Sequence, residues 1–409
     1  MSINDDLFQK LGEQGYEGSL NDRMFKKLRG DGYTGSLSDM LGQVGGGKSW
    51  KEEIATASPN LVPTIDFTQW YNVPLSPMDS VTTDTFTNVG TGYIQLDIGA
   101  EAGEVYTITI NQTRGAGTCL IYLAAEQGVT QADEVWGLEG GEETITLVAD
   151  GPWLTFRASV GDTTTTVTEL RVVKTSKLKY LIDKLFSDSA PGAFYQPDIL
   201  VNNQQALFQN SDGTVAVPAS GGRVGYMVDA SGNGNHAYQD GESARPSYPG
   251  LIYSGAGEWL KTDLAIDSDY FGPGFLWCFW SKWASLESNT GSNGGAYQNP
   301  RLYTQMVGGG GMRVAVGDQF ATLVTGVIQD EWMHVAVYYD GATVRPFLNK
   351  VAGTTMGAVF AGNTVEAFRI GQGFEFNREM NGAIGSQFIV AGDRADYEDL
   401  INLHYELGP

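Results

Sequence analysis

Residues 61–174 alternate between apolar and polar positions with a period of two. The alternation is regular at 106–110, 144–148 and 153–156, and Gly, Asp and Asn residues separate these runs. A period of two places every second side chain on one face, as in antiparallel strands that cover a core. The pattern predicts a β-sandwich over residues 61–175.

Residues 190–409 form a second strand-rich region. Apolar runs recur at 277–280, 333–337 and 368–370. Asp340-Gly341 is a favourable hairpin turn, because Gly accepts a positive φ. We predict a second sandwich over 190–409, so the expected fold class is mainly β, with two β-sandwich (jelly-roll) domains.

The hydrophobic period changes to that of a helix between the two β regions. Apolar residues fall on one side of residues 177–186, KLKYLIDKLF. A helix this short is marginal in water, so it must pack on a domain or on copies of itself. We interpret 176–189 as a linker helix with an unpaired apolar face.

The N-terminal residues contain a tandem repeat with a period of 17, because DLFQKLGEQGYEGSLND is followed by MFKKLRGDGYTGSLSDM. Ser19 and Ser36 are each followed three residues later by Asp, which is typical of a helix N-terminus. We predict short helices over 1–45 that cannot bury their apolar stripes alone and therefore dock on another protein or on each other. The residues expected to dock are Phe8, Leu11, Tyr16, Phe25, Leu28 and Tyr33.

Residues 46–60 are expected to form a flexible linker. Residues 42–49, which overlap the start of this linker, match the phosphate-loop spacing G-x-x-x-x-G-K-S. That motif needs a buried strand before the loop, and here a predicted helix precedes it, so we do not expect nucleotide binding.

The composition and net charge of the chain limit the classes of partner that it is expected to bind. Glycine accounts for 54 of 409 residues, which fits turn-rich β structure, and the net charge is −23. Such a charge repels phosphate backbones, so nucleic acid is not an expected partner. Cys119 and Cys278 are far apart and are expected to be buried thiols. The chain shows no secretion signal and no apolar run long enough to span a membrane.

Several segments resemble known families. Residues 61–175, with IDFTQW, YTITI and LTFRASVGDTTTTVTELRVVK, are similar to carbohydrate-binding-module jelly rolls, and a spacer domain without ligand is the alternative. Residues 332–350, WMHVAVYYDGATVRPFLNK, resemble the central hairpin of laminin-G-like, concanavalin A-like sandwiches, and 254–262 and the final DYEDLINLHYEL resemble other elements of that family. Residues 224–248 and the GYxGSLxD repeats resemble segments of bacteriophage virion proteins.

Catalysis is not expected. A retaining glucanase needs two carboxylates about 5.5 Å apart, and no Glu-x-Asp-x-Glu strand is present. Glu375 with Glu379 and Asp267 with Asp269 lie in loop-like sequence and are interpreted as solvated charges. The histidines, His236, His334 and His404, have no nucleophile motif beside them.

A sugar-binding site needs aromatic faces and fixed polar groups, which loops supply. The candidate glycan-binding residues are Tyr238, Tyr248, Trp259, Tyr297 and Tyr303. Asp229, Asn233 and Asn235 in DASGNGN are candidate Ca²⁺ ligands, with a simple polar turn as the alternative. No other cofactor is expected.

The resemblances imply a virion protein, assembled in the host cytoplasm, with a fibre or tail-associated role in binding host-surface glycan. Its expected partners are other virion proteins, through the N-terminal repeats, and further copies of itself, as a trimer that gives multivalent attachment. The alternative is a capsid decoration or head fibre protein with a purely structural role and no glycan ligand.

Deleting residues 1–45 should leave both β regions folded but absent from purified particles, because the repeats are the expected anchor. The measurement is the copy number of the truncated chain in virions, with circular dichroism to confirm folding. Incorporation at the normal copy number would place the anchor elsewhere.

Overall fold

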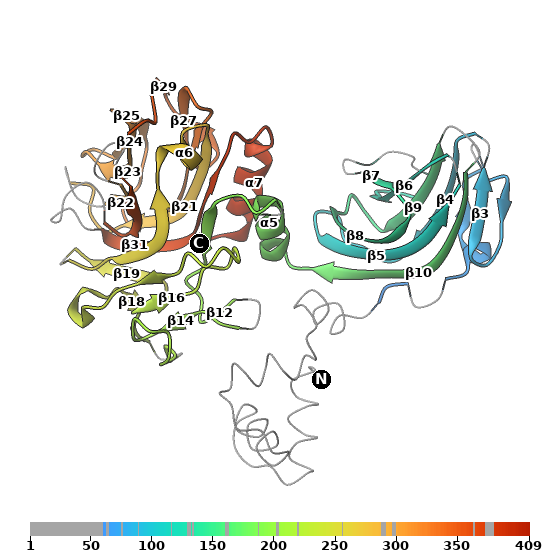
Figure 1. Cartoon of the computed structure of the whole chain (residues 1–409), viewed down its shortest axis with the longest axis horizontal. Coiled ribbons are helices and arrows are strands. Elements are labelled where there is room, and N and C mark those ends of the chain that lie inside the picture. Colours follow the sequence, from blue (N-terminus) through green and yellow to red (C-terminus); the bar gives the residue numbers. More distant parts are fainter. Residues whose placement is uncertain are drawn as a thin grey trace, which may run out of the picture. The chain divides into compact units, whose positions relative to one another are not determined.

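A computed structural model describes residues 60–409 apart from some short stretches (Figure 1). Those stretches are 63–64, 75–76, 89, 116, 129–131, 133–134, 160–162, 187, 202–203, 219–220, 256, 288–291, 297–299, 363–364 and 373–379. The predicted helical repeats at 1–45, with Phe8, Leu11, Tyr16, Phe25, Leu28 and Tyr33, lie outside the described residues, as does the linker up to residue 59. The chain divides into two compact units, Met1–Lys174 and Thr175–Pro409.

The first unit contains two five-stranded antiparallel sheets. One sheet has the order β1 (Tyr71–Asn72), β4 (Gly92–Asp97), β9 (Trp153–Ser159), β6 (Thr118–Ala124), β7 (Trp136–Leu138). The other has the order β2 (Ser80–Val81), β3 (Thr85–Asn88), β10 (Thr163–Thr175), β5 (Val105–Arg114), β8 (Gly141–Val148). The short 3₁₀ helix η1 (Phe67–Gln69) precedes them.

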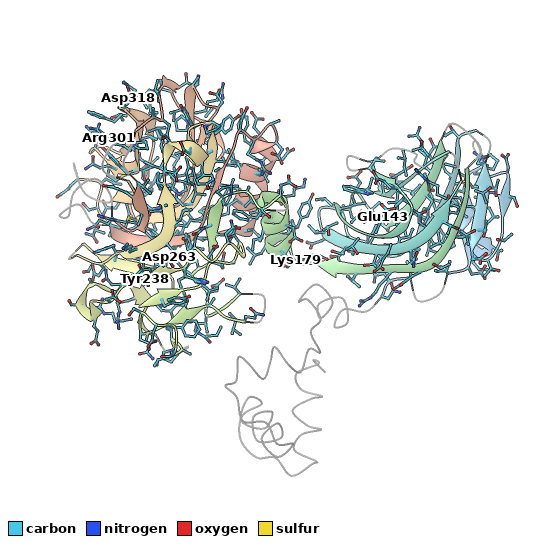
Figure 2. All side chains as sticks on the ribbon, in the orientation of Figure 1. Glu143, Lys179, Tyr238, Asp263, Arg301 and Asp318 are labelled. Carbon is cyan, nitrogen blue, oxygen red and sulfur yellow. The ribbon has the colours of Figure 1, made fainter. Side chains whose placement is uncertain are left out.

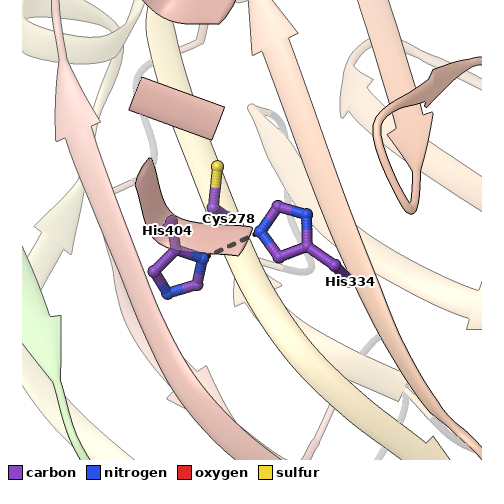
Figure 3. Close-up of side chains that lie close together, drawn as sticks. All are labelled: Cys278, His334 and His404. Carbon is purple, nitrogen blue, oxygen red and sulfur yellow. Dashed lines mark hydrogen bonds between the residues drawn. The ribbon is translucent and has the colours of Figure 1, made fainter. Parts of the chain in front are cut away.

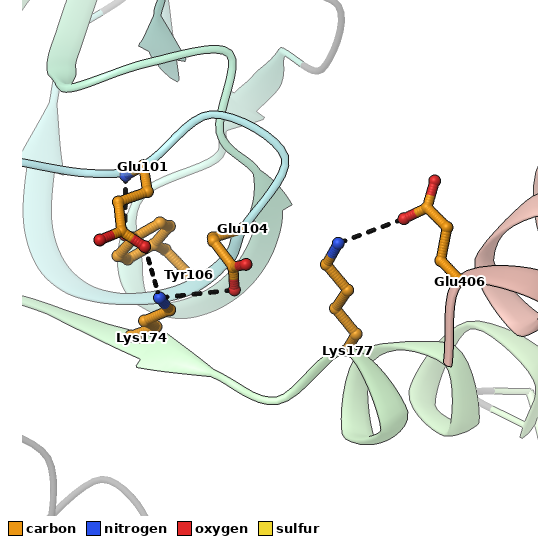
Figure 4. A network of polar contacts seen from close by, with 6 residues as sticks. All are labelled: Glu101, Glu104, Tyr106, Lys174, Lys177 and Glu406. Carbon is orange, nitrogen blue, oxygen red and sulfur yellow. Dashed lines mark hydrogen bonds and ion pairs between the residues drawn. The ribbon is translucent and has the colours of Figure 1, made fainter. Parts of the chain in front are cut away.

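An aromatic cluster fills the core of the first unit. The Phe67 ring makes edge contacts with Trp70, Phe86 and Phe156 at centroid distances of 4.9, 5.3 and 5.7 Å. Alternating residues of both sheets complete this core, as the period of two predicts. At the end of β10, Lys174 pairs with Glu101 (2.8 Å) and Glu104 (3.5 Å) on the surface (Figure 4).

The second unit is built on a ten-stranded sheet that faces two smaller sheets. The strands of the large sheet are β15 (Gly222–Arg223), β18 (Ser247–Tyr248), β19 (Leu251–Ser254), β31 (Asn381–Ala391), β21 (Phe275–Trp283), β26 (Trp332–Tyr339), β27 (Thr343–Leu348) and β28 (Val351–Ala352), with β11 (Gly192–Tyr195) on β31 and β29 (Met356–Gly357) on β27. A five-stranded sheet contains β14 (Leu207–Phe208), β16 (Tyr226–Met227), β17 (Ala237–Tyr238), β20 (Leu260–Ile266) and β30 (Glu366–Ile370). A four-stranded sheet contains β22 (Ser292–Ala296), β23 (Arg301–Met306), β24 (Gly311–Gly317) and β25 (Gln319–Thr325). The shorter elements are the pair β12 (Leu200–Val201) and β13 (Gln204–Gln205), η2 (Glu242–Ala244) and α6 (Ser268–Phe271).

The main core of the second unit lies between the large sheet and the two smaller ones. β21 contributes Phe275, Trp277 and Phe279 to it. The smaller sheets contribute the alternate residues of β20, β30, β23 and β24. β22 lies beside β30, so the two smaller sheets adjoin along one side of this core.

β21 is apolar on its second face as well, and two helices cover that face. Leu276 and Cys278 of β21 pack in a cluster with α5 (Lys177–Phe186) and α7 (Tyr397–Leu407). α5 and α7 lie side by side (Figure 1), and Lys177 Nζ pairs with Glu406 at 3.2 Å (Figure 4). The central strands of the large sheet are therefore buried on both sides.

The mainly β fold class is confirmed. The turn at Asp340-Gly341 joins β26 to β27, with Gly341 at φ 89° and Asp340 Oδ1 accepting from the N–H groups of Ala342 and Thr343. Both cysteines are buried free thiols, as expected.

The interpretation of 176–189 as a linker helix with an unpaired face requires correction. The helix forms at 177–186, but Leu181 and Leu185 are fully buried against the large sheet of the second unit. Its apolar stripe is covered because β21 also needs cover on this side. The helix therefore gives no support to the expected trimer.

Replacing Leu181 with Ala should lower the free energy of unfolding of the second unit by about 2–5 kcal/mol, because it leaves a cavity under the helix. Hydrogen exchange of peptides from β21 and β26 in urea reports this stability. Asp188→Ala, at an exposed position beyond the helix, is the matched control. Equal effects of the two substitutions would contradict the packing role of α5.

Candidate functional site

A buried group of potential metal ligands lies beneath α7. His334 of β26, His404 of α7 and Cys278 of β21 offer ligand atoms within 4.8 Å of one another, and all three residues are buried (Figure 3). Nε2 of His334 and Nδ1 of His404 are 2.8 Å apart and share a hydrogen bond. Among the described residues this is the one cluster of three or more such side chains.

The hydrogen bonding of the two histidines and the neutral state of the cysteine favour a packing role for this cluster over metal binding. Nδ1 of His334 and Nε2 of His404 are buried without a hydrogen-bond partner among the described residues. A metal between the two facing nitrogens would place protons on both outer nitrogens, and neither has an acceptor to orient it. Burial also raises the pKa of the Cys278 thiol well above its usual value, which disfavours the thiolate that metals bind.

The candidate calcium loop is organised around Asp229. Oδ1 of Asp229 accepts from the N–H groups of Phe194 and Ser231, and Oδ2 accepts from Ser231 Oγ and the Asn235 N–H. The amides of Asn233 and Asn235 donate to the Gly192 carbonyl. A cation at this carboxylate would meet the hydrogens of bound donors instead of free oxygen lone pairs. The geometry is therefore that of a simple polar turn, which was the alternative to a calcium site, and this turn holds β11 in place.

The predicted glycan-binding aromatics are dispersed. Tyr238 and Trp259 are both half-buried and come together near β20, whereas Tyr248 lies on the large sheet and packs against the core. Tyr297 lies outside the described residues. Tyr303 lies within β23 and is only 2% exposed, so its ring offers no surface on which a sugar could stack.

Tyr238 and Trp259 belong to a cationic and aromatic patch. Tyr238 is the register partner of Lys261, which is in turn the partner of Arg369 on β30. Lys261 Nζ lies 5.9 Å from the centre of the Tyr238 ring, and the Arg369 guanidinium carbon lies 5.3 Å from that of Trp259. These side chains point away from the core because Leu260 and Ile370, next to Lys261 and Arg369 along their strands, point into it.

We call this outward side of the five- and four-stranded sheets the open face. It carries Tyr238, Trp259, Lys261 and Arg369 on the five-stranded sheet, and Arg301, Arg313 and Phe320 on the four-stranded sheet. Asp263 lies two residues beyond Lys261 on the same side, near Tyr238 (Figure 2). The patch therefore offers aromatic surface, N–H donors and a carboxylate acceptor together.

Sequence reasoning missed the cations and Phe320. Alternation in LKTDLAI and FRI places Lys261 and Arg369 opposite the apolar residues, which was a usable signal. Their pairing across strands more than 100 positions apart was not visible in the sequence. Phe320 is 51% exposed in β25, at a strand position where a large apolar side chain is otherwise expected in a core.

The acidic residues and the histidine considered for catalysis either have a structural role or lie outside the described residues. Oδ1 of Asp267 accepts from the N–H groups of Asp269 and Tyr270 and caps α6. Glu375 and Glu379 lie outside the described residues. His236 accepts at Nδ1 from the Asp229 N–H, which fixes the polar turn.

A polar cluster also lies on the first unit. The Arg157 guanidinium carbon is 5.6 Å from the centre of the Tyr93 ring, and Tyr122 is beside them. The Tyr122 hydroxyl and Arg157 Nε are buried without a hydrogen-bond partner among the described residues. Burial, more than the neighbouring Tyr93, raises the pKa of Tyr122, so this phenol stays protonated and can donate.

No helix within the described part of the chain is long and apolar enough to cross a bilayer.

No family model matches the chain, and no curated protein matches its sequence. Solved structures that are similar include the binding domain of botulinum neurotoxin serotype D, with 14% identity, a TM-score of 0.35 and coverage of 44% of this chain and 49% of that one. The receptor-binding domain of the C/D mosaic serotype has 12% identity, a TM-score of 0.38 and coverage of 54% and 52%. Domain 4 of AbnA, a GH43 extracellular arabinanase from Geobacillus stearothermophilus in complex with arabinotriose, has 20% identity, a TM-score of 0.32 and coverage of 52% and 98%. The chain thus spans about half the length of the neurotoxin chains. With TM-scores below 0.5, these similarities assign none of those proteins' functions to this chain.

Stability should fall as the pH drops below about 6.5, because the buried histidines resist protonation. Desolvation, and then Lys350, lowers the pKa of His334 to about 3, and desolvation, followed by His334, lowers that of His404 well below its usual value. The unfolded chain takes up protons near pH 6.5 that the folded chain cannot, so stability is full above that pH and is lost toward pH 3. At pH 5 the loss from His334 alone is on the order of 2 kcal/mol.

Urea unfolding at pH 7.5 and 5.0 measures this loss. Glutamine at position 404 cannot titrate, so the His404→Gln variant should show a smaller pH dependence of stability than the unchanged chain. An unchanged pH dependence in that variant would show that other groups cause it.

Proposed function

We propose that the chain is a carbohydrate-binding protein whose second unit holds a glycan on the open face. The observation that carries this proposal is the patch of Tyr238, Lys261, Arg369 and Trp259, where half-buried rings lie beside N–H donors on or next to adjacent strands.

The chemistry of sugars suits this patch. The C–H faces of a pyranose stack on aromatic surfaces, and its hydroxyl oxygens accept hydrogen bonds from ammonium and guanidinium groups. Asp263 supplies an acceptor for a sugar hydroxyl on the same side. Since Tyr238, Lys261 and Arg369 are on strands that pack on a continuous core, these groups are held in place before the ligand arrives.

We propose binding without catalysis. Among the described residues, the open-face patch combines one carboxylate, Asp263, with two cations, whereas glycoside hydrolysis uses a pair of carboxylates. A calcium requirement is not part of this proposal, because the oxygens of Asp229 are already engaged.

The resemblance of 224–248 and of the N-terminal repeats to bacteriophage virion segments supports a more specific role. In that role the chain is a fibre or tail-associated appendage in the virion. Its repeats dock on other virion proteins, and its copies, as a trimer, contact the host-surface glycan. A capsid decoration or head fibre protein without a sugar ligand is the second candidate, and it also fits the virion resemblance.

Trp259→Ala and Tyr238→Ala in the full chain should each weaken glycan binding about tenfold, because each removes a stacking surface. A glycan array identifies bound oligosaccharides, and titration of the best of them gives the affinities. Tyr270→Ala is the control, since Tyr270 is 57% exposed on α6, outside the patch.

Equal weakening in all three variants would contradict the assignment to the open face. An array on which the chain binds no sugar would favour the decoration protein.

A further inference from the structure

A second group of side chains on the open face has a different chemistry from the patch around Trp259. Phe320 is half exposed, and two guanidinium groups lie near its ring, with carbon-to-centroid distances of 5.7 Å for Arg301 and 5.2 Å for Arg313. Gln305, which is 1% exposed, accepts at Oε1 from Arg313 Nη1 at 3.4 Å. We call Arg301, Arg313, Phe320 and Gln305 the guanidinium clamp.

Strand register brings the clamp together. Tyr303, Ala315 and Phe320 lie opposite one another on β23, β24 and β25. Arg301 precedes Tyr303 by two residues and Arg313 precedes Ala315 by two, so both point to the same side as Phe320. Because the side chain of Ala315 is small, the side chains of Arg301 and Arg313 can both extend toward the Phe320 ring.

The two arginines of the clamp lack a carboxylate partner at ion-pair distance among the described residues. Within the described part of the chain, neither Arg301 nor Arg313 forms an ion pair with a carboxylate, although the chain holds 48 acidic residues against 25 basic ones. Asp318 is nearby (Figure 2), but its oxygens accept from Gln319 Nε2 and the Val359 N–H. Those hydrogen bonds, more than Arg301, lower the pKa of Asp318.

The clamp also contains buried donors that lack acceptors. Arg301 Nε and Gln305 Nε2 have no hydrogen-bond partner among the described residues. Buried N–H groups are normally satisfied. Donors without an acceptor in the described part of the chain, beside two guanidiniums that form no ion pair there, indicate a site for an acceptor from outside the chain.

We infer that the guanidinium clamp binds the carboxylate or phosphate of an acidic sugar, with the sugar ring against Phe320. This inference rests on the proposed function and specifies the class of its ligand. Arginine recognises planar oxyanions through paired N–H groups, and the phenyl ring supplies the apolar surface that a free anion would not use.

The strongly negative chain is compatible with such a ligand. At physiological ionic strength, charges more than roughly 8 Å away are largely screened, so the clamp acts on a single acidic residue of a glycan. A long polyanion such as DNA would extend past the clamp and meet the remaining acidic surface.

The test is titration calorimetry of the full chain with matched ligand pairs. Oligogalacturonate and its methyl ester share a ring structure and differ in charge, as do mannose 6-phosphate and mannose. Sialyllactose carries an acidic sugar residue that lactose lacks. At least one acidic member should bind tenfold or more tightly than its neutral partner, and the three pairs distinguish carboxylate from phosphate.

Arg301→Gln and Arg313→Gln should each reduce that preference about tenfold while leaving neutral ligands unaffected. Lys350→Gln removes one positive charge elsewhere, beside Tyr405, and should change neither. Raising the salt concentration from 50 to 500 mM should weaken the acidic ligands alone.

Equal binding of acidic and neutral members in all three pairs would overturn the clamp, and so would equal losses in the Lys350 and arginine variants. If neutral sugars bind through Trp259 without an acidic preference, the proposed function stands and the clamp fails. If acidic sugars bind through the arginines and Trp259→Ala has no effect, the clamp stands and the patch around Trp259 fails.

Discussion

The second unit depends on a single constraint, which is that strand β21 is apolar on both faces. Phe275, Trp277 and Phe279 fill the core between the sheets, and Leu276 and Cys278 on the other side need a separate cover. Burying one large side chain contributes about 1.5–3 kcal/mol, so exposing the three rings would cost about 5–9 kcal/mol, a large part of the roughly 5–15 kcal/mol by which a typical domain is stable. The smaller sheets cover one face, and α5 and α7 cover the other.

This constraint determines which surface remains for a ligand. The central strands of the large sheet are covered on both sides within the described residues. The smaller sheets use one side for the core, and no described helix packs on their other side. Strand alternation then places Lys261 and Arg369 there because Leu260 and Ile370 are needed inside. The open face is therefore a consequence of how the core is closed.

The sequence was sufficient to predict the elements that depend on the local pattern of residues. Alternation predicted the mainly β fold, the helical period predicted the helix that forms at 177–186, and Asp340-Gly341 predicted the hairpin turn. It was insufficient where strand order decides the environment. Nothing local in KLKYLIDKLF shows that β21 needs cover, and nothing near Tyr303 shows that its strand lies between two others. Likewise, Asp229 has the composition of a cation ligand, yet the distant Phe194 N–H supplies one of the donors that saturate it.

A hydrogen-exchange footprint of the full chain, with and without a saturating bound oligosaccharide, tests the account most directly. The account predicts slower exchange in β17, β20 and β30, extending to β23–β25 when the sugar is acidic, with no change in α5 and α7. Protection confined to the first unit, or to the helix-covered side of the second, would contradict the assignment of ligand binding to the open face.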